Sequence, residues 1–326
     1  MIKIATVQAT PIFLNREATI EKASYLIAEA GRNGARLVTF PESFLPSYPD
    51  WVWAVPAGDK GVLDELYAEL LDQAVTVPSL VAERLCQAAR NANCYVVMGI
   101  SERNAEASNA SMYNTLIYID DQGNLLGKHR KLVPTGGERL VWAQGDGSTL
   151  GVYSTPFGVL SGLICWENYM PLARYALYAW GTQIYVAATW DRGEPWLSTI
   201  RHIAKEGRVF VLSSCIALRT ADIPDHYEFK KKYYRSNREW INVGDSAIVN
   251  PEGEFIAGPV HKKEEILYAE IDPRQMCGPK WMLDVAGHYG RPDVFQLLVN
   301  KASWPIISEI SEERPAISND SNGFTD

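Results

Sequence analysis

The chain has few cysteines for its length: five in 326 residues, at positions 86, 94, 165, 215 and 277. The number is odd and no pair has C-x-x-C spacing. Both facts argue against a disulfide framework and against a structural zinc site. We therefore expect reduced thiols and a cytoplasmic location.

Long apolar runs and excess positive charge are also missing. No stretch reaches the roughly 18 apolar residues that a membrane-spanning helix needs. The first eight residues lack the basic and apolar regions of a secretion signal, and we expect them to form a strand. The chain has 31 Lys+Arg against 39 Asp+Glu, a net charge of −8, and its longest basic run is three lysines at 230–232. An acidic chain is a poor match for phosphate backbones, so we expect neither a nucleic-acid partner nor a membrane partner.

Apolar segments of strand and helix type alternate along most of the chain. The expected helices cover 17–33, 78–93 (with Pro78 at the start), 171–180 and 196–207. The expected strands cover 3–9, 36–40, 94–100, 113–120, 124–132, 159–164, 183–188, 208–217, 246–250, 254–257 and 266–271. This alternation predicts an α/β layered fold with a mixed sheet, in a single domain over residues 1–300. The polar end of the chain, 301–326, is predicted to be a partly disordered tail.

Two segments interrupt the alternation, 47–59 and 219–242. Both are rich in aromatic side chains. A surface loop is the simplest interpretation, but such a large aromatic area more often packs on a ligand or a partner.

Cys165 is the first candidate for chemistry. It follows an apolar strand, and Pro171 a few residues later suits the first turn of a helix. A cysteine at a helix N-terminus is favoured as a thiolate by the helix dipole. Taken alone, a cysteine after an apolar strand is more often a small buried hydrophobic residue, and we expect this of the other four cysteines.

Three charged residues complete a candidate site. Glu42 follows the strand at 36–40, and its neighbours Phe and Pro would desolvate it and raise its pKa, as suits a general base. Lys131 ends a basic strand, and Glu138 follows a Gly-Gly pair that lets the chain bend back. Each residue alone would be a surface charge or a helix cap. Together, just beyond strands of an open sheet, they supply the base and the cation that a thiol nucleophile needs.

Three segments resemble the signature segments of the nitrilase superfamily of carbon–nitrogen hydrolases: Phe40-Pro41-Glu42-Ser43, the run from His129 to Thr135, and Cys165-Trp166-Glu167-Asn168. The resemblance covers roughly residues 1–300. It extends to the nitrilase branch through Lys131 to Trp142, Cys165 to Arg174 and Gly287 to Phe295. Amidase branches usually have Tyr-Asp or a similar pair after the cysteine, where this chain has Trp166-Glu167.

The resemblance implies a four-layer α-β-β-α sandwich that pairs into a dimer and assembles further into spirals or filaments through the C-terminal region and inserted loops. It also implies that no metal and no organic cofactor takes part. The five histidines agree, because they show neither H-x-x-H nor H-E-x-x-H spacing.

By this resemblance, the expected reaction is hydrolysis of a nitrile to a carboxylic acid and ammonia, with Cys165 as the nucleophile, Glu42 as the base, and Lys131 and Glu138 as the assisting groups. We expect Tyr48, Trp166, Glu167 and Trp190 to bind the substrate. Aromatic side chains suit an apolar or aryl nitrile, although core packing would equally explain the tryptophans.

Three alternatives remain. The chain could hydrolyse an amide, a carbamoyl compound or cyanide with the same nucleophile. It could be a non-catalytic assembly protein, although such a protein would be free to lose the four residues. It could also pair Cys165 with His129 or His202 instead of a glutamate.

Overall fold

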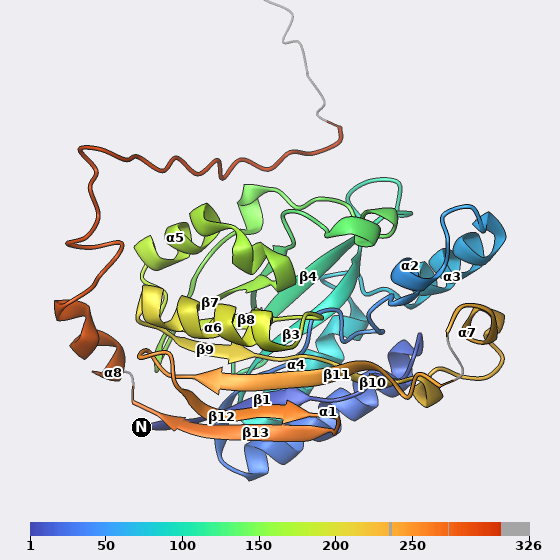
Figure 1. The fold of residues 1–326 in the computed structure, drawn as a ribbon, viewed down its shortest axis with the longest axis horizontal. Helices are drawn as coiled ribbons and strands as arrows, with labels where there is room; N and C mark the ends of the chain where they lie inside the picture. The colour runs from blue at the N-terminus through green and yellow to red at the C-terminus, as the bar shows by residue number, and fades with distance from the viewer. Residues whose placement is uncertain (235–236, 273, 308–326) are drawn as a thin grey trace, which may run out of the picture.

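The computed structural model describes residues 1–234, 237–272 and 274–307. Two β-sheets form its centre (Figure 1). The first has the spatial order β13 (Glu265–Ile271), β1 (Ile2–Gln8), β2 (Ala35–Thr39), β3 (Tyr95–Arg103), β4 (Met112–Ile119) and β5 (Leu125–Arg130). The second has the order β10 (Ala217–Arg219), β11 (Trp240–Val249), β9 (Phe210–Ser213), β8 (Ile184–Ala188), β7 (Gly158–Ile164) and β6 (Tyr153–Thr155), with β12 (Phe255–His261) paired to β11.

Both sheets are mixed. Strands β1, β2 and β3 run parallel, as do β7, β8 and β9, and the outer pairs are antiparallel. The central parallel strands are almost continuously apolar because both of their faces are covered. One cluster of buried side chains joins the inner faces of the two sheets, from Val38 on β2 to Val186 on β8.

Helices cover the two outer faces (Figure 1). Helices α1 (Arg16–Arg32) and α4 (Leu80–Ala92) pack on each other and on the first sheet. Helices α5 (Pro171–Ala179) and α6 (Glu194–Gly207) cover the second sheet over a separate apolar cluster. The predicted α-β-β-α sandwich is therefore confirmed.

Local sequence signals account for the helix ends. The side chain of Asn15 caps α1 by accepting from the backbone N–H of Ala18. At α4 the cap is Ser79, which accepts from Ala82, so the helix begins after Pro78 rather than at it.

The two aromatic segments pack on the chain itself. Residues 47–59 contain α2 (Trp51–Ala54). The next element, α3 (Lys60–Gln73), is a helix that the sequence pattern does not predict. The segment 219–242 contains α7 (Glu228–Tyr233), and the ring of Tyr227 lies edge-on to Phe13 at 5.2 Å. Phe229 is buried beside them. Much of the aromatic area assigned to a ligand or a partner is therefore used within the fold.

Two smaller expectations need correction. The predicted strand at 208–217 is interrupted after Ser213, and the chain then forms β10 in the same sheet. Cys277 ends the short helix α8 (Arg274–Cys277) and is exposed rather than buried, whereas the other four cysteines are buried.

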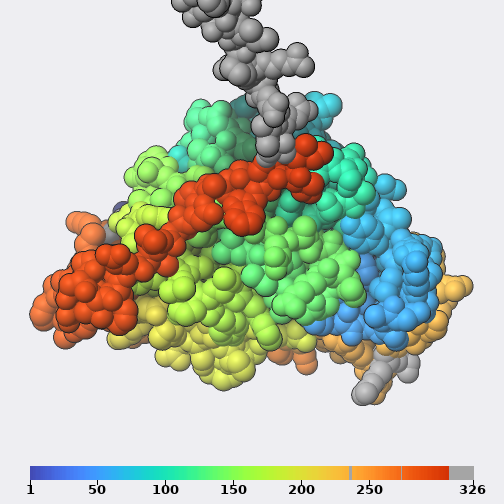
Figure 2. All heavy atoms as spheres, turned by 90° about the horizontal axis from the view of Figure 1, so that it is seen from above, coloured from blue at the N-terminus to red at the C-terminus, as the bar shows by residue number. Residues whose placement is uncertain are grey.

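The last described residues run extended over the outside of the sandwich (Figure 2). The Lys301 ammonium lies 4.9 Å from the ring centre of Trp180, and the Trp304 backbone N–H donates to Asp146. Most of the predicted tail, from 308 onward, lies outside the described residues. Within the described part of the chain, no helix is long and apolar enough to cross a membrane.

Candidate active site

Glu42 lies just beyond β2 and is completely buried. Its Oε1 accepts hydrogen bonds from Asn114 Nδ2 and from Lys131 Nζ, both at 2.7 Å. Its Oε2 has no hydrogen-bond partner among the described residues. Only a glycine fits at position 99 on the neighbouring strand, because a side chain there would collide with the carbonyl of Pro41.

Lys131 follows the last residue of β5. Its ammonium is fully buried and lies 2.7 Å from Glu42 Oε1 and 2.7 Å from Glu138 Oε2. The preceding side chain, Arg130, takes the other direction and pairs with Glu102. Two carboxylates around one ammonium satisfy the condition under which a buried charge is tolerated, namely that it is paired and hydrogen-bonded.

Glu138 belongs to the short 3-10 helix η1 (Gly136–Leu140). Its Oε2 accepts from the backbone N–H of Thr135, which closes a capping box, as well as from Lys131. Its Oε1 accepts from the Tyr48 hydroxyl at 2.7 Å. The Gly-Gly pair before it makes this return turn, as the sequence predicts, and Gly136 has a φ of +51°.

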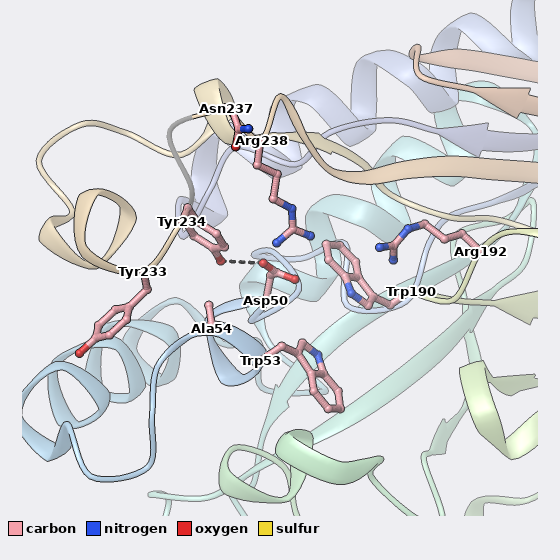
Figure 3. A pocket seen from close by; sticks show the side chains of 9 residues that line it. All are labelled: Asp50, Trp53, Ala54, Trp190, Arg192, Tyr233, Tyr234, Asn237 and Arg238. Atoms are coloured by element: carbon pink, nitrogen blue, oxygen red, sulfur yellow. Dashed lines mark hydrogen bonds between the residues drawn. The ribbon is translucent and has the colours of Figure 1, made fainter.

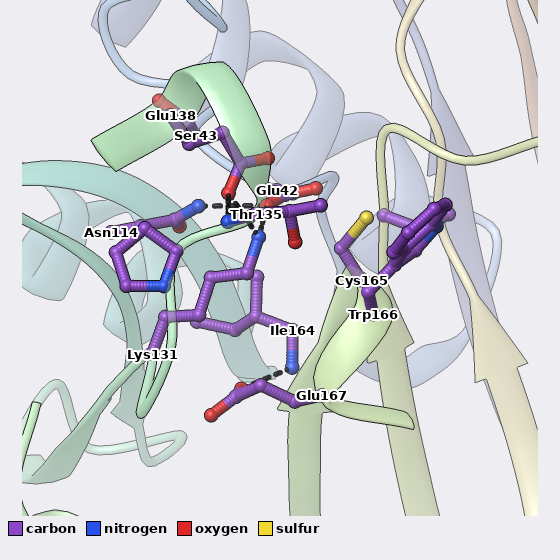
Figure 4. A network of polar contacts seen from close by, with 12 residues as sticks. Glu42, Ser43, Asn114, Lys131, Thr135, Glu138, Ile164, Cys165, Trp166 and Glu167 are labelled. Atoms are coloured by element: carbon purple, nitrogen blue, oxygen red, sulfur yellow. Dashed lines mark hydrogen bonds and ion pairs between the residues drawn. The ribbon is translucent and has the colours of Figure 1, made fainter. Parts of the chain in front are cut away.

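Cys165 stands at the end of β7, in the first position of the 3-10 helix η3 (Cys165–Tyr169). Its φ of +51° is a left-handed conformation that a non-glycine residue adopts at a cost of about 1–3 kcal/mol. Figure 4 shows its sulfur directed toward the charged cluster. The Sγ atom and a carboxylate oxygen from each of Glu42 and Glu138 all lie within 4.8 Å of one another.

The environment sets the protonation states. Burial raises the pKa of Glu42 to about 7; Lys131 counteracts this and Glu138 adds to it. Burial lowers the pKa of Lys131, but Glu42, Cys165 and Glu138 together outweigh it and raise that pKa. The ammonium is therefore retained, and Glu42 titrates near neutrality.

The expectation of a Cys165 thiolate is wrong for the resting site. Burial raises the pKa of the Cys165 thiol, and the negative charge of Glu42 raises it further, while Lys131 opposes them only in part. Helix α5 begins only at Pro171, and the intervening helix is a single short 3-10 turn, so no long helix dipole acts on the sulfur. The direction of this shift favours the neutral thiol in the resting site.

The acidic residues at this site do not form an open metal site. Glu42, Glu138 and Cys165 offer three clustered ligand atoms. The place between the two carboxylates is filled by Lys131 Nζ, in contact with both. A divalent cation there would meet the ammonium at close range, so these residues do not fit a resident metal ion.

The structure places two of the four predicted substrate-binding residues next to this cluster. The Tyr48 and Trp190 rings stack with centroids 4.2 Å apart, and Tyr48 also contacts Glu138. Trp166 is 53% exposed, and its indole N–H donates to Asp191. It therefore lies toward the outer surface rather than inside the cluster.

Glu167 has a different position from the one expected of a substrate-binding residue. Its carboxylate accepts from the backbone N–H of Leu132 at 2.6 Å and of Ile164 at 2.8 Å, and it pairs with His129 at 3.1 Å. These groups occupy both of its oxygens, and Figure 4 shows it pointing away from the other charged residues. The geometry is that of a brace between the residue after Lys131 and the residue before Cys165.

Asn114 was not identified from the sequence. It lies on β4, its side-chain amide N–H donates to Glu42, and its backbone carbonyl accepts from the Lys131 backbone N–H. An amide inside an otherwise apolar strand was the available signal, because buried polar groups need partners.

The histidine alternatives receive no support from the geometry. The Nε2 of His129 is bound to Glu167. The His202 side chain on α6 is 65% exposed and lies beside Glu206. The acceptors clustered with the sulfur are carboxylates.

Comparison with known proteins identifies the family. The sequence model of the carbon–nitrogen hydrolase family matches residues 3–277. The chain belongs to this family. Among curated proteins, "Nitrilase 2" of Arabidopsis thaliana is 39% identical over 99% of this chain and 95% of its own length. "Aliphatic nitrilase" of Sinorhizobium fredii is 41% identical over 92% of this chain and 96% of its own.

Two solved structures share the fold. Nit3 of Saccharomyces cerevisiae, a member of branch 10 of the nitrilase superfamily, superposes with a TM-score of 0.68 at 20% identity, over 88% of this chain and 96% of that one. An amidase from Nesterenkonia sp. gives a TM-score of 0.64 at 19% identity, over 85% of this chain and 92% of that one.

Proposed function

We propose that this carbon–nitrogen hydrolase is a nitrilase that converts an organic nitrile to its carboxylic acid and ammonia. The observation that carries the proposal is a buried cluster: the Cys165 sulfur lies within 4.8 Å of a carboxylate that titrates near neutrality, and that carboxylate is paired with an ammonium at 2.7 Å. Relatives named nitrilases, about 40% identical over nearly the whole chain, support the choice of substrate class.

The first half of the reaction attaches the substrate to the enzyme. Glu42 Oε2, which has no partner among the described residues, takes the proton of Cys165 as the sulfur attacks the nitrile carbon. One C≡N π bond is replaced by a C–S bond, and the proton passes to nitrogen, which gives a thioimidate. A base at this place is needed because the thiol is neutral at rest.

The second half uses two water molecules. Glu42 removes a proton from the first water as it adds to the thioimidate. Both protons of this water pass to the nitrogen, and the C–N bond then breaks to release ammonia and leave a thioester. The second water adds in the same way, and the C–S bond breaks to release the acid and restore the thiol. If the first tetrahedral species loses the thiol instead of ammonia, the product is the amide.

Lys131 and Glu138 serve these steps electrostatically. The Lys131 ammonium stabilises negative charge that develops on the substrate nitrogen or oxygen, in a site shielded from bulk water. Glu138 holds that ammonium in place and is itself fixed by Tyr48 and Thr135. Because these groups interact closely, their titrations belong to the set rather than to single residues.

Ammonia release tests the proposal. Wild type and Cys165→Ala are compared on aliphatic, arylacetic and aromatic nitriles, on cyanide and on the matching amides. We expect ammonia from nitriles with the wild type and a loss of at least about a thousandfold in the variant, whose circular dichroism should be unchanged. Substantial nitrile hydrolysis by Cys165→Ala would refute the covalent mechanism. Ammonia from amides alone would make the protein an amidase, and no ammonia from any compound would favour an assembly role.

We also propose a cytoplasmic location for the protein, supported by the free cysteines.

We further propose that the protein self-associates into a dimer or a larger assembly. Exposed apolar side chains support this, near α5 (Leu172) and along the C-terminal segment (Phe295 and Leu298). Sedimentation of the purified protein tests this self-association, and a monomer at micromolar concentration would overturn it.

A further inference from the structure

A cavity of about 810 Å³ lies next to the catalytic cluster. It is lined by Asp50, Trp53, Ala54, Trp190, Arg192, Tyr233, Tyr234, Asn237 and Arg238 (Figure 3). Two of the lining side chains contact Tyr48. The Trp190 ring stacks on the Tyr48 ring, and the Trp53 indole N–H donates to the Tyr48 hydroxyl at 3.0 Å. The same tyrosine donates to Glu138, so Tyr48 connects these two lining tryptophans to the catalytic charges.

Two guanidinium groups point into this cavity. Arg192 follows the end of β8, and Arg238 precedes β11; in Figure 3 both are directed toward the space above Asp50 and Trp190. Arg238 is held by the carbonyls of Trp240 and Ile241, at 3.2 and 2.9 Å. Within residues 1–234, 237–272 and 274–307, neither guanidinium forms an ion pair with a carboxylate, although most arginines of low exposure elsewhere in the chain are paired.

Asp50 is the one carboxylate among the lining residues. It is buried and accepts a hydrogen bond from the Tyr234 hydroxyl at 2.6 Å. Burial raises the pKa of Asp50, although Tyr234, Arg238 and Arg192 counteract the rise. Even with Asp50 ionised, the lining carries two positive charges against one negative charge. This local excess stands out in a chain whose net charge is −8.

We propose that this cavity binds the distal end of the substrate and that the substrate is a nitrile carrying a carboxylate at that end, held by Arg192 and Arg238. The inference rests on the proposed function and names its substrate class. The aromatic walls would pack on the carbon chain between the two functional groups.

The physical basis is the match between a guanidinium and a carboxylate. The planar N–H fork of arginine donates two parallel hydrogen bonds to the two oxygens of a carboxylate. A cleft with low-dielectric walls and a net positive charge also concentrates a negatively charged substrate, which the acidic surface would otherwise repel. A substrate ending in an ammonium group would meet two guanidiniums and be disfavoured.

Hydrolysis of matched substrates tests the proposal. Straight-chain nitriles of increasing length are prepared as the ω-carboxylate and as its methyl ester, and the ratio of the two kcat/KM values is measured for each length. We expect the wild type to prefer the carboxylate. Arg192→Gln and Arg238→Gln should each lower the ratio by about tenfold, as expected for loss of a charge-assisted hydrogen bond. The control Arg84→Gln, on the exposed face of α4, should leave the ratio unchanged. Added salt should lower kcat/KM for the carboxylate more than for the ester.

A binding measurement separates this inference from the proposed function. Cys165→Ala is titrated with glutarate, a dicarboxylate of the product class, and the fluorescence of the tryptophans is recorded; the same titration is repeated with Arg192→Gln added. Arginine-dependent binding without hydrolysis of any nitrile by the wild type would keep the anion site and reject the nitrilase activity. Any of three results would overturn the inference. The wild type could have the same kcat/KM for the carboxylate and the ester, or the arginine variants could lower both kcat/KM values equally. In the third result, Arg192→Gln would leave glutarate binding unchanged.

Discussion

Replacing Glu42 by glutamine tests the proposed base without changing the shape of the site. The amide oxygen can still accept from Asn114 and Lys131, as Oε1 does in the native site. It cannot accept the thiol proton, so kcat should fall by at least about a hundredfold, the lower end of the contribution of a general base. In the wild type, kcat/KM should rise with pH until Glu42 is ionised, at a pKa of about 7.

The same substitution has a pH-dependent effect on stability. Glu42 has a raised pKa in the folded protein, about 7 against 4.5 in the unfolded chain, so between these values the folded state binds more protons. Its contribution to the free energy of unfolding is therefore complete below the unfolded pKa and is lost as the pH rises through the folded pKa. Between about pH 5 and about pH 8 the loss is on the order of 2–3 kcal/mol.

Denaturant unfolding of the wild type and of Glu42→Gln across this pH range measures the effect. Groups distant from the site titrate alike in both proteins, so the difference between the two unfolding free energies reports Glu42 together with the neighbours to which it is coupled, Lys131 and Cys165. We expect the wild type to lose stability relative to the variant as the pH rises. A difference that stays flat, or that changes in the opposite direction, would refute the assignment of a protonated Glu42 below neutrality. Full activity of the variant would refute its role as the base.

Two further substitutions test the buried charge and the aromatic wall. Lys131→Met leaves Glu42 and Glu138 without their cation and should lower the free energy of unfolding, measured with denaturant, by about 3–5 kcal/mol. The control Lys205→Met removes one partner of an exposed ion pair and should lower it by no more than about 1 kcal/mol. Similar losses in the two variants would contradict the importance of the buried pairing. Trp190→Ala should cost about 3 kcal/mol, because this side chain is only 8% exposed. It should also shift the ratio of kcat/KM for bulky and small nitriles, and an unchanged ratio would remove Trp190 from the substrate pocket.

The sequence predicts the layers of the fold well because each layer has a local pattern. Continuous apolar runs mark the central parallel strands, and amphipathic repeats with polar caps such as Asn15 mark the covering helices. Helix α3 was missed because only two of its side chains, Leu66 and Leu70, are buried, so its apolar pattern is weak.

The site was predictable in its outline for a related reason. Glu42 and Cys165 follow strands, Lys131 ends one, and Glu138 follows a Gly-Gly turn, so simple rules for open sheets bring them together. For Asn114 the sequence offers only an amide within an apolar strand, because its partner Glu42 is distant in sequence and the fold alone brings the two together. The raised pKa of the Cys165 thiol also escaped prediction, because it depends on how completely the folded chain excludes water.

The brace formed by Glu167 bears on how such an enzyme can be redesigned. One carboxylate holds the chain next to Lys131 in the first sheet and the chain next to Cys165 in the second. The spacing between ammonium and sulfur is therefore set by a crosslink between sheets rather than by the loops at the cavity mouth. Libraries of variants with substitutions around Arg192 or Asn237 can change the shape of the cavity while the distance between the reacting groups is kept. Changes at Glu167 should instead impair the hydrolysis of every substrate alike.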